Sequence, residues 1–127
     1  MLLLLDTHAF LWWNADDEAL GPKARAAIAD PDNVVFVSAA SVWEISLKRA
    51  SGKLDAPGNA AEWIERNRFA PLAIEIGHAA RAPELPRHHT DPFDRMLVAQ
   101  ASIEDYTLVT SDDEIAKYDI DILDAST

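Results

Sequence analysis

Met1-Leu-Leu-Leu-Leu-Asp-Thr7 opens the chain, and this stretch decides the fold. Its five consecutive apolar residues leave no polar face, so they predict a strand buried on both sides, as in a parallel sheet. Asp6 follows this strand directly. Ligands of open parallel sheets bind beyond the carboxyl ends of the strands, so we expect Asp6 to lie at a functional edge.

Strands and helices alternate along the rest of the chain. The residue pattern predicts further strands over 33–38, 72–76, 106–110 and 120–123, and helices over 8–13, 22–30, 38–51, 59–68, 76–82, 92–105 and 112–117. The helix from Pro92 has the clearest start, because Asp91 can cap it and proline suits its first turn. This alternation predicts an α/β fold with a parallel sheet and helices on both faces.

Length and composition fit a single domain, residues 1–127. Hydrophobic residues make up 49% of the chain, which is enough for a buried core. The chain has no cysteine, which excludes a disulfide scaffold, a cysteine-ligated zinc site and a thiol nucleophile. No apolar run has the length of a signal-peptide core or a membrane span, so we expect a cytoplasmic protein. Residues 52–59, with Pro57 and Gly58, are predicted to form a loop.

The net charge of −11, from 22 acidic and 11 basic residues, is unusual for a protein that binds nucleic acid. Such proteins usually carry a basic patch. Most of the acids must lie on the solvated surface, but a few that gather at one place could hold divalent cations and reverse the local field. The remaining attraction for phosphate could come from Lys48, Arg49, Lys53, Arg87 and Arg95.

Four carboxylates stand at positions that could bring them together. Asp6 and Asp112 follow strands whose carboxyl ends meet at one edge of a parallel sheet. Glu44 and Asp94 lie early in the two best-defined helices. A lone Asp after a strand is more often a cap or turn residue than a ligand. The four together predict a functional site without naming its substrate.

Asp94 continues an apolar helix face. Leu97, Val98 and Ala101 follow it at spacings of three, four and seven residues and share that face. A carboxylate that faces the core is either paired or functional, because an unpaired buried charge is costly. Mg²⁺ and Mn²⁺ are hard cations that prefer oxygen ligands and would relieve the repulsion among such acids. Two such ions can activate a water and stabilise the leaving oxygen of a phosphodiester.

Four segments, in order along the chain, resemble the motifs of PIN-domain ribonucleases. They are Leu2-Leu-Leu-Leu-Asp-Thr-His8, Ser38-Ala-Ala-Ser-Val-Trp-Glu-Ile45, His89-Thr-Asp-Pro-Phe-Asp-Arg-Met-Leu-Val-Ala-Gln-Ala101 and Leu108-Val-Thr-Ser-Asp-Asp113. The third is very similar to the motif of VapC-type toxins of type II toxin–antitoxin systems. The resemblance runs from residue 2 to about residue 123 and implies a PIN-like three-layer fold, with a central, mostly parallel sheet and helices on both faces.

The resemblance implies a toxin that is a metal-dependent endoribonuclease, with Mg²⁺ or Mn²⁺ as cofactor. A metal-activated water would hydrolyse the RNA phosphodiester and leave a 5′ phosphate and a 3′ hydroxyl. The implied partners are a second copy of the chain and a small VapB-like antitoxin, whose Arg or Lys could enter the acidic cleft; no membrane is implied. Matched residue by residue, the catalytic and metal-binding acids are Asp6, Glu44, Asp94 and Asp112.

Neighbouring polar residues are candidates for supporting roles. Within the third motif, the helix-cap argument gives Asp91 a structural role. Within the fourth, Asp113 stands behind Asp112 as a supporting or helix-start acid. Arg95 could contact a phosphate or pair with a neighbouring acid. Three hydroxyl residues could hydrogen-bond to the ligand carboxylates or serve equally well as caps and turns: Thr7, Ser38 and Thr110.

Histidines and tryptophans carry weaker signals. His88 and His89 could be acid–base or phosphate-contacting groups, although His89 is better suited to ordering the loop before Asp91. The tryptophans could stack on RNA bases, but burial in the core or in an interface is the stronger expectation. They are Trp12, Trp13, Trp43 and Trp63.

Two other classes of function remain open from the sequence. A non-catalytic PIN-like module that binds RNA or protein would not need a complete set of four acids. A phosphoacceptor signalling domain also places acids at strand ends and binds Mg²⁺. That class requires a second acid beside the first strand, and Asp6 has no adjacent acid. Labelling with a small phosphodonor would distinguish a signalling domain from a nuclease.

Overall fold

A parallel sheet forms the centre of the computed structural model, which describes residues 1–55 and 58–127. Its five strands lie in the order β3-β2-β1-β4-β5, and every neighbouring pair is parallel. The strands are β1 (Leu2–Leu5), β2 (Val34–Ser38), β3 (Ala70–Leu72), β4 (Thr107–Thr110) and β5 (Ile122–Asp124). The predicted parallel sheet is therefore confirmed.

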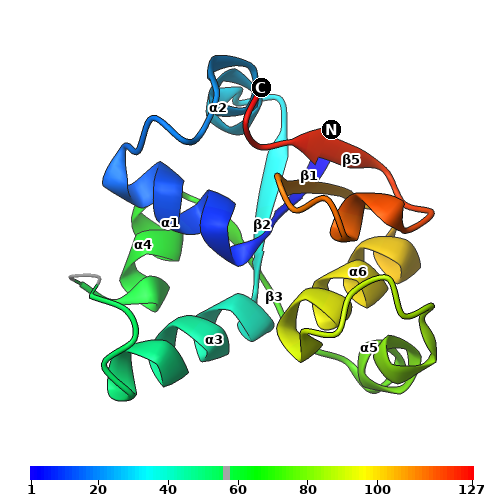
Figure 1. Cartoon of the computed structure of the whole chain (residues 1–127). Helices are drawn as coiled ribbons and strands as arrows, with labels where there is room; N and C mark the ends of the chain where they lie inside the picture. Colours follow the sequence, from blue (N-terminus) through cyan, green and yellow to red (C-terminus); the bar gives the residue numbers. More distant parts are fainter. Residues whose placement is uncertain (56–57) are drawn as a thin grey trace.

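Helices cover both faces of this sheet, as the sequence predicts (Figure 1). One side carries α1 (Thr7–Ala15), α2 (Pro22–Ala29) and α4 (Ala60–Arg66), and the other carries α5 (Ile76–Arg81) and α6 (Pro92–Glu104). Helix α3 (Ala39–Ala50) follows β2 directly, and the short 3-10 helices η1 (Ala82–Glu84) and η2 (Ile115–Lys117) complete the fold. Among the described helices, none combines the length and apolar character needed to cross a bilayer.

Successive residues of the central strands alternate between two cores. Leu3 and Leu5 pack with α1, α2 and α4, whereas Leu4 packs with α6. The neighbouring strands follow the same rule, with Val37 in the first core and Leu108 in the second. A strand with a core on each side needs apolar residues at every position, which explains the unbroken leucine run.

The main difference from the sequence-based expectation concerns β3. This strand spans Ala70–Leu72, so the strand predicted over 72–76 was placed too late. Pro71 lies inside it, which is tolerated because β3 is an edge strand and needs no donor on its outer side. The helix predicted over 112–117 shortens to η2, while the other boundaries agree within two residues. Residues 56 and 57 of the predicted 52–59 loop lie outside the described residues.

The strand order indicates at which edge of the sheet a ligand could bind. The chain runs from β1 to β2 and β3 on one side, and returns to β4 and β5 on the other. In such sheets a crevice opens outside the carboxyl ends of the strands, where the order reverses. Asp6 follows β1, Ser38 ends β2 and Thr110 ends β4, so all three residues lie at this edge.

Candidate active site

Four carboxylates from four different elements gather at this edge. Asp6 caps α1, Glu44 lies on α3, Asp94 lies in the first turn of α6, and Asp112 follows β4. The charges of Glu44 and Asp6 both raise the pKa of Asp94, and the charge of Asp112 raises that of Asp6. Asp94 is therefore within electrostatic reach of Glu44 and Asp6, and Asp6 of Asp112, while the ligand atoms of Asp94, Asp112 and His89 lie within 4.8 Å of one another. We call the four acids the carboxylate site.

Asp6 is held rigidly and is 4% exposed. Its Oδ1 accepts the N–H of Ala9 at 2.7 Å, and its own N–H donates to the carbonyl of Val109 at 3.0 Å. Burial raises the pKa of Asp6, while hydrogen bonds from Thr110 and Ala9 work in the opposite direction. The first turn of α1 and the β1–β4 pairing thus fix this carboxylate at the sheet edge.

The two oxygens of Glu44 have different surroundings. Oε2 accepts a hydrogen bond from Lys48 Nζ at 2.6 Å, one helical turn further along α3. Oε1 is buried and has no hydrogen-bond partner among the described residues. Leaving a buried charged oxygen without a partner costs free energy. This oxygen therefore fits the role of a ligand to a hard cation.

Asp94 is strongly perturbed although its side chain is 21% exposed. Burial raises the pKa of Asp94 to about 7, and the negative charge of Asp91 adds to the effect, while His89 opposes it. The apolar face predicted for this helix is confirmed, since Leu97, Val98 and Ala101 are buried in the second core. Such a raised pKa is expected for a carboxylate crowded by other acids without a cation.

His89 lies at the site; the sequence marked it as an acid–base, phosphate-contacting or loop-ordering residue, without placing it against Asp94 and Asp112. Its Nε2 lies 3.0 Å from Asp112 Oδ2 and 3.2 Å from Asp94 Oδ2, and these three atoms could together surround a metal ion. Its Nδ1, however, accepts the N–H of Asp91 at 3.0 Å. The proton of the neutral ring therefore sits on Nε2, and Nε2–H donates to Asp112 instead of binding a cation.

The hydrogen bond between His89 and Asp112 favours the charged form of both side chains. Burial alone would lower the pKa of His89, but the hydrogen bond to Asp112 and the nearby negative charges raise it above its ordinary value. Burial would raise the pKa of Asp112, but hydrogen bonds from His89 and from the N–H groups of Glu114 and Ile115 lower it. His89 also orders the loop before Asp91, as its place in the sequence suggested.

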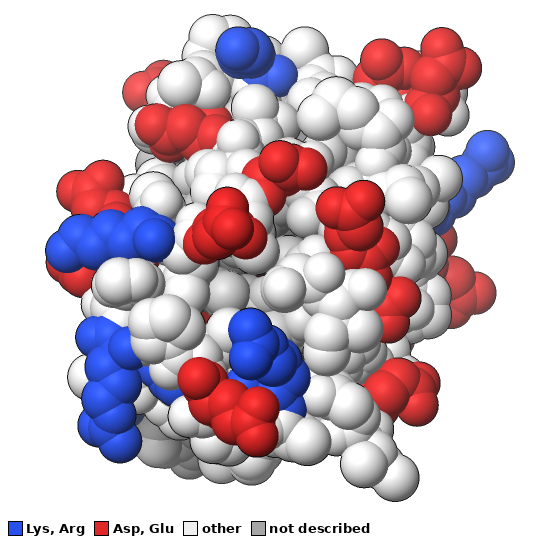
Figure 2. Space-filling model, turned by 90° about the vertical axis from the view of Figure 1, so that its right-hand side faces the viewer, with Lys and Arg blue, Asp and Glu red and all other residues white. Residues whose placement is uncertain are grey.

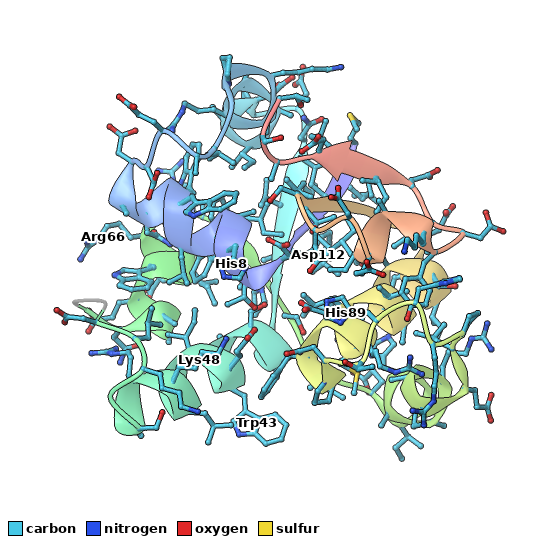
Figure 3. All side chains as sticks on the ribbon, in the orientation of Figure 1. His8, Trp43, Lys48, Arg66, His89 and Asp112 are labelled. Atoms are coloured by element: carbon cyan, nitrogen blue, oxygen red, sulfur yellow. The ribbon has the colours of Figure 1, made fainter. Side chains whose placement is uncertain are left out.

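Lys48 also lies at the site; the sequence named it among the basic residues that could attract phosphate but did not predict its contact with Glu44. Its hydrogen bond to Glu44 raises the pKa of Lys48, and the charges of Asp91 and Asp94 act in the same direction. Figure 3 shows Lys48 on the α3 side of the region where α1, α3 and α6 meet, with His89 and Asp112 on the opposite side. The sequence signal was its position one turn after Glu44, which is shared by many surface ion pairs.

Thr110 links two of the acids. Its hydrogen bond to Asp6 lowers the pKa of that carboxyl, and its Oγ1 accepts the N–H of Asp112 at 3.1 Å. Asp113 is exposed and makes no side-chain hydrogen bond or ion pair within residues 1–55 and 58–127. The supporting role predicted for Thr110 is thus matched by contacts, and that of Asp113 is not.

Thr7 and Ser38 shape the elements around the site. The buried hydroxyl of Thr7 donates to Ser41 Oγ at 3.0 Å and so connects α1 to α3. Ser38 Oγ accepts the N–H of Ala40 at 3.0 Å, which makes Ser38 the N-cap of α3. Both residues therefore hold the helices that carry the acids.

Arg95 is committed to the loop that leads into α6. Its guanidinium donates to backbone carbonyls on both sides of that loop and to the hydroxyl of Tyr118. The carbonyls are those of Ala82, Pro83, Leu85, Pro86 and His89. These bonds occupy the guanidinium, so it stabilises the loop in place of the phosphate contact considered from the sequence.

The tryptophans divide into two groups. Three pack against the first core, as expected, and Trp13 also donates to Asn67 at 3.0 Å. Trp43 is 60% exposed and meets Phe93 edge to face, with ring centroids 5.1 Å apart. His88 is exposed beside Tyr118, away from the four acids in its contacts.

Comparison with known proteins agrees with this geometry. Residues 3–121 match the family model of the PIN domain. The chain is 29% identical to Ribonuclease VapC22 of Mycobacterium tuberculosis over 113 residues, which cover 87% of this chain and 86% of that protein. It is 34% identical to Ribonuclease VapC16 of the same organism over 62 residues, 46% and 44% of the two chains.

A solved structure supports the fold independently. The crystal structure of VapBC2 from Rickettsia felis, bound to a DNA fragment from their promoter, contains a chain that matches with a TM-score of 0.70. The match covers 97% of this chain and 98% of that one, at 14% identity. At this identity the likeness shows the fold alone, and it confirms the predicted PIN-like α/β arrangement.

Proposed function

This chain belongs to the PIN-domain family, and from that premise we propose that it is an Mg²⁺- or Mn²⁺-dependent endoribonuclease, the toxin of a toxin–antitoxin pair. Both curated relatives bear the name ribonuclease. The proposal treats residues 1–127 as one PIN domain, of which residues 3–121 match the family model. The observation that carries the proposal is the convergence of four carboxylates, one of them with a buried oxygen that has no hydrogen-bond partner among the described residues.

The carboxylate site offers the oxygen ligands that a hard divalent cation prefers. Asp6, Glu44 and Asp94 would hold the cation, and Asp112 would complete that site or help a second one. The unpartnered Oε1 of Glu44 and the raised pKa of Asp94 support this assignment. A bound Mg²⁺ or Mn²⁺ would activate water and neutralise charge on the scissile phosphate.

The chain's own residues hold the acids in place for this chemistry. Asp6 is fixed by Ala9 and Thr110, and the Nε2–H of His89 donates to Asp112 while Nε2 lies 3.2 Å from Asp94 Oδ2. Water, which the bound cation would activate, would be the nucleophile at the phosphorus. As the P–O3′ bond breaks, the hydroxyl of water would stay on phosphorus and its proton would end on O3′, so the products would carry a 5′ phosphate and a 3′ hydroxyl.

The proposed partners are an RNA substrate, a small VapB-like antitoxin protein and a second copy of the chain. The name VapBC2 of the structural neighbour supports the antitoxin, whose Arg or Lys would pair with the carboxylates. Exposed Trp43, Leu47 and Ile76 support association of two copies. With RNA as the substrate and no membrane partner, the site of action is the cytoplasm.

The cleavage experiment compares the purified protein with Glu44→Gln and with Glu62→Gln, an exposed glutamate on α4. The unmodified protein and Glu62→Gln should cut RNA with Mg²⁺ or Mn²⁺ and stop in EDTA, and Glu44→Gln should be inactive. Mapping of the RNA ends should find 5′ phosphates. Equal cleavage in excess EDTA would overturn the metal mechanism, and RNA binding without cleavage in either cation would favour a non-catalytic module.

The association experiment uses light scattering of the purified chain alone and with a candidate antitoxin. Alone, the chain should have twice its single-chain mass of 14.0 kDa. A single-chain mass at every concentration would overturn the dimer. A complex in which the antitoxin leaves Asp6 and Asp94 open to solvent would overturn the blocking mode.

A further inference from the structure

Lys48 presents free hydrogen-bond donors beside the carboxylate site. Its ammonium carries three N–H groups, and the bond to Glu44 Oε2 at 2.6 Å uses one of them. Within residues 1–55 and 58–127 Nζ makes no other hydrogen bond, and the side chain is 43% exposed. A positive group with unused donors is therefore accessible at the place where RNA must approach the acids.

The cation ligands and Lys48 do not compete for the same atom. Lys48 binds Oε2 of Glu44, whereas Oε1 of the same carboxylate is the buried oxygen without a partner. A divalent ion could use Oε1 while Lys48 stays on Oε2. The ammonium would then remain next to the bound phosphate throughout, and its position would be set by the ion pair.

Three other basic side chains are occupied elsewhere or point elsewhere. Arg95 is committed to backbone carbonyls, and Arg49 donates to the carbonyl of Gly58. Arg66 on α4 points away from the region around His89 and Asp112 (Figure 3). In the part of the chain that the structure describes, Lys48–Glu44 is the ion pair that joins a Lys or Arg to a predicted cation ligand.

The overall charge makes such a local cation important. A chain with a net charge of −11 repels RNA at long range, so local contacts must supply the attraction. Lysine is a compact point charge that binds phosphate oxygens without reading the base. An ammonium at this place therefore fits the RNA backbone better than a base edge.

We propose that Lys48 is a substrate-binding residue that keeps its ion pair with Glu44 and donates its free N–H groups to an RNA phosphate at the carboxylate site. The identity of the substrate rests on the proposed function. The contact itself concerns binding, so it can be measured without cleavage and without a bound divalent ion.

The test measures RNA affinity in a protein whose ion pair has already been neutralised. Replacing Lys48 alone would leave the Glu44 carboxylate unpaired, and its charge would itself repel RNA. Glu44→Gln removes that charge while its amide oxygen can still accept an N–H of Lys48, and it is expected to bind RNA without cutting it. Fluorescence anisotropy in EDTA then compares this protein with versions that also carry Lys48→Gln, Lys48→Arg or Lys23→Gln. Lys23, exposed on α2, supplies the same change of charge far from the site (Figure 1).

Lys48→Gln should weaken RNA binding roughly three- to tenfold in this background, which is the order expected for one lost phosphate contact. Lys48→Arg should retain most of the affinity, and Lys23→Gln should change it little. Equal affinity with and without Lys48 would overturn the proposal and leave Lys48 as a structural partner of Glu44. An equal loss from Lys23→Gln would also overturn it, since net charge would then explain the effect.

A modified RNA locates the contact. One neutral methylphosphonate linkage is placed at successive positions, and the affinity difference between Glu44→Gln and Glu44→Gln/Lys48→Gln is measured at each. The difference should vanish at one position, and its persistence at all positions would overturn a phosphate contact. Cleavage by the unmodified protein is assayed separately, so failure to cleave with an intact Lys48 effect would refute the nuclease and not this contact.

Discussion

At the scale of single residues, Asp94 is a carboxylate whose ionisation is disfavoured in the folded chain. Its pKa rises from 3.8 to about 7 in the folded chain, mainly because the group is buried. The folded state therefore holds this proton more tightly than the unfolded state. Its contribution to stability is complete below about pH 3.8 and is lost as the pH rises through about 7. Without a cation, the ionised carboxylate destabilises the fold at pH 8.

Replacing Asp94 by Asn should make the protein more stable and abolish its RNA cleavage. Asn is nearly isosteric and uncharged, so in EDTA at pH 8 it should raise the free energy of unfolding by about 1 to 4 kcal/mol, from about 1.4 kcal/mol per pKa unit. At pH 4 the gain should nearly disappear, because the native carboxyl is already protonated. RNA cleavage should be lost at every pH. Urea denaturation at both pH values and a cleavage assay measure these effects.

Asp91→Asn is the matched control within the same motif. Asp91 Oδ1 accepts the N–H groups of Phe93 and Asp94 at 2.9 and 3.1 Å, which makes it the N-cap of α6. Asn caps helices equally well, so activity should largely survive. An inactive Asp91→Asn beside an active Asp94→Asn would show that the ligand is assigned to the wrong carboxylate.

At the scale of elements, His78 joins two helices on the second face of the sheet. It is 1% exposed, and its Nδ1 accepts the N–H of Glu75 at 2.9 Å at the start of α5. Its Nε2 therefore carries the proton and donates to Glu104 Oε1 on α6 at 3.0 Å. One buried ring thus accepts the backbone N–H at the start of α5 and fixes this helix against α6, the helix that carries Asp94.

His78→Leu should destabilise the fold without changing the chemistry of the site. Leucine fills most of the space but makes neither hydrogen bond, so the free energy of unfolding should fall by about 2 kcal/mol. Glu104→Gln keeps an acceptor oxygen and should cost much less. Urea denaturation measures both variants, and cleavage under conditions where they are folded should stay near the unmodified level. No loss of stability in His78→Leu would contradict the assigned link.

At the scale of the whole molecule, the excess of acids sets how the protein responds to cations. Figure 2 shows acidic side chains spread over one face with Lys and Arg among them, so the acids of this face are scattered rather than gathered at one place. Only a cluster such as the carboxylate site can bind a divalent ion tightly. An ion that binds the folded state and not the unfolded chain stabilises the fold by mass action.

Mg²⁺ or Mn²⁺ should therefore raise the melting temperature of the protein. At a hundred times the dissociation constant the gain is about 2.7 kcal/mol. The gain should be reversed by EDTA and should be absent in Asp94→Asn. It should also shrink below about pH 6, because protons then compete with the cation for a carboxylate with a pKa of about 7. Thermal melts at matched ionic strength in NaCl provide the control. An equal shift in NaCl would indicate general screening of the negative charge.

The sequence by itself determined the features that depend on neighbours along the chain. The unbroken leucine run predicted a strand with a core on each side, and the pattern Asp91-Pro92 predicted the start of α6. Motif order identified the acids Asp6, Glu44, Asp94 and Asp112 as one set. Alternation and caps act within a few residues, so they can be read without knowing the fold.

Only the tertiary structure decided what each side chain contacts across the fold. The place of β3 depended on pairing with β2, and its proline was tolerable only because the strand lies at an edge. The contact of His89 with Asp112 spans 23 residues and exists because the start of α6 and the end of β4 meet at one edge of the sheet. The spacing of Glu44 and Lys48 along α3 allows their ion pair, but the burial that leaves Oε1 without a hydrogen-bond partner among the described residues depends on the packing of other elements around α3.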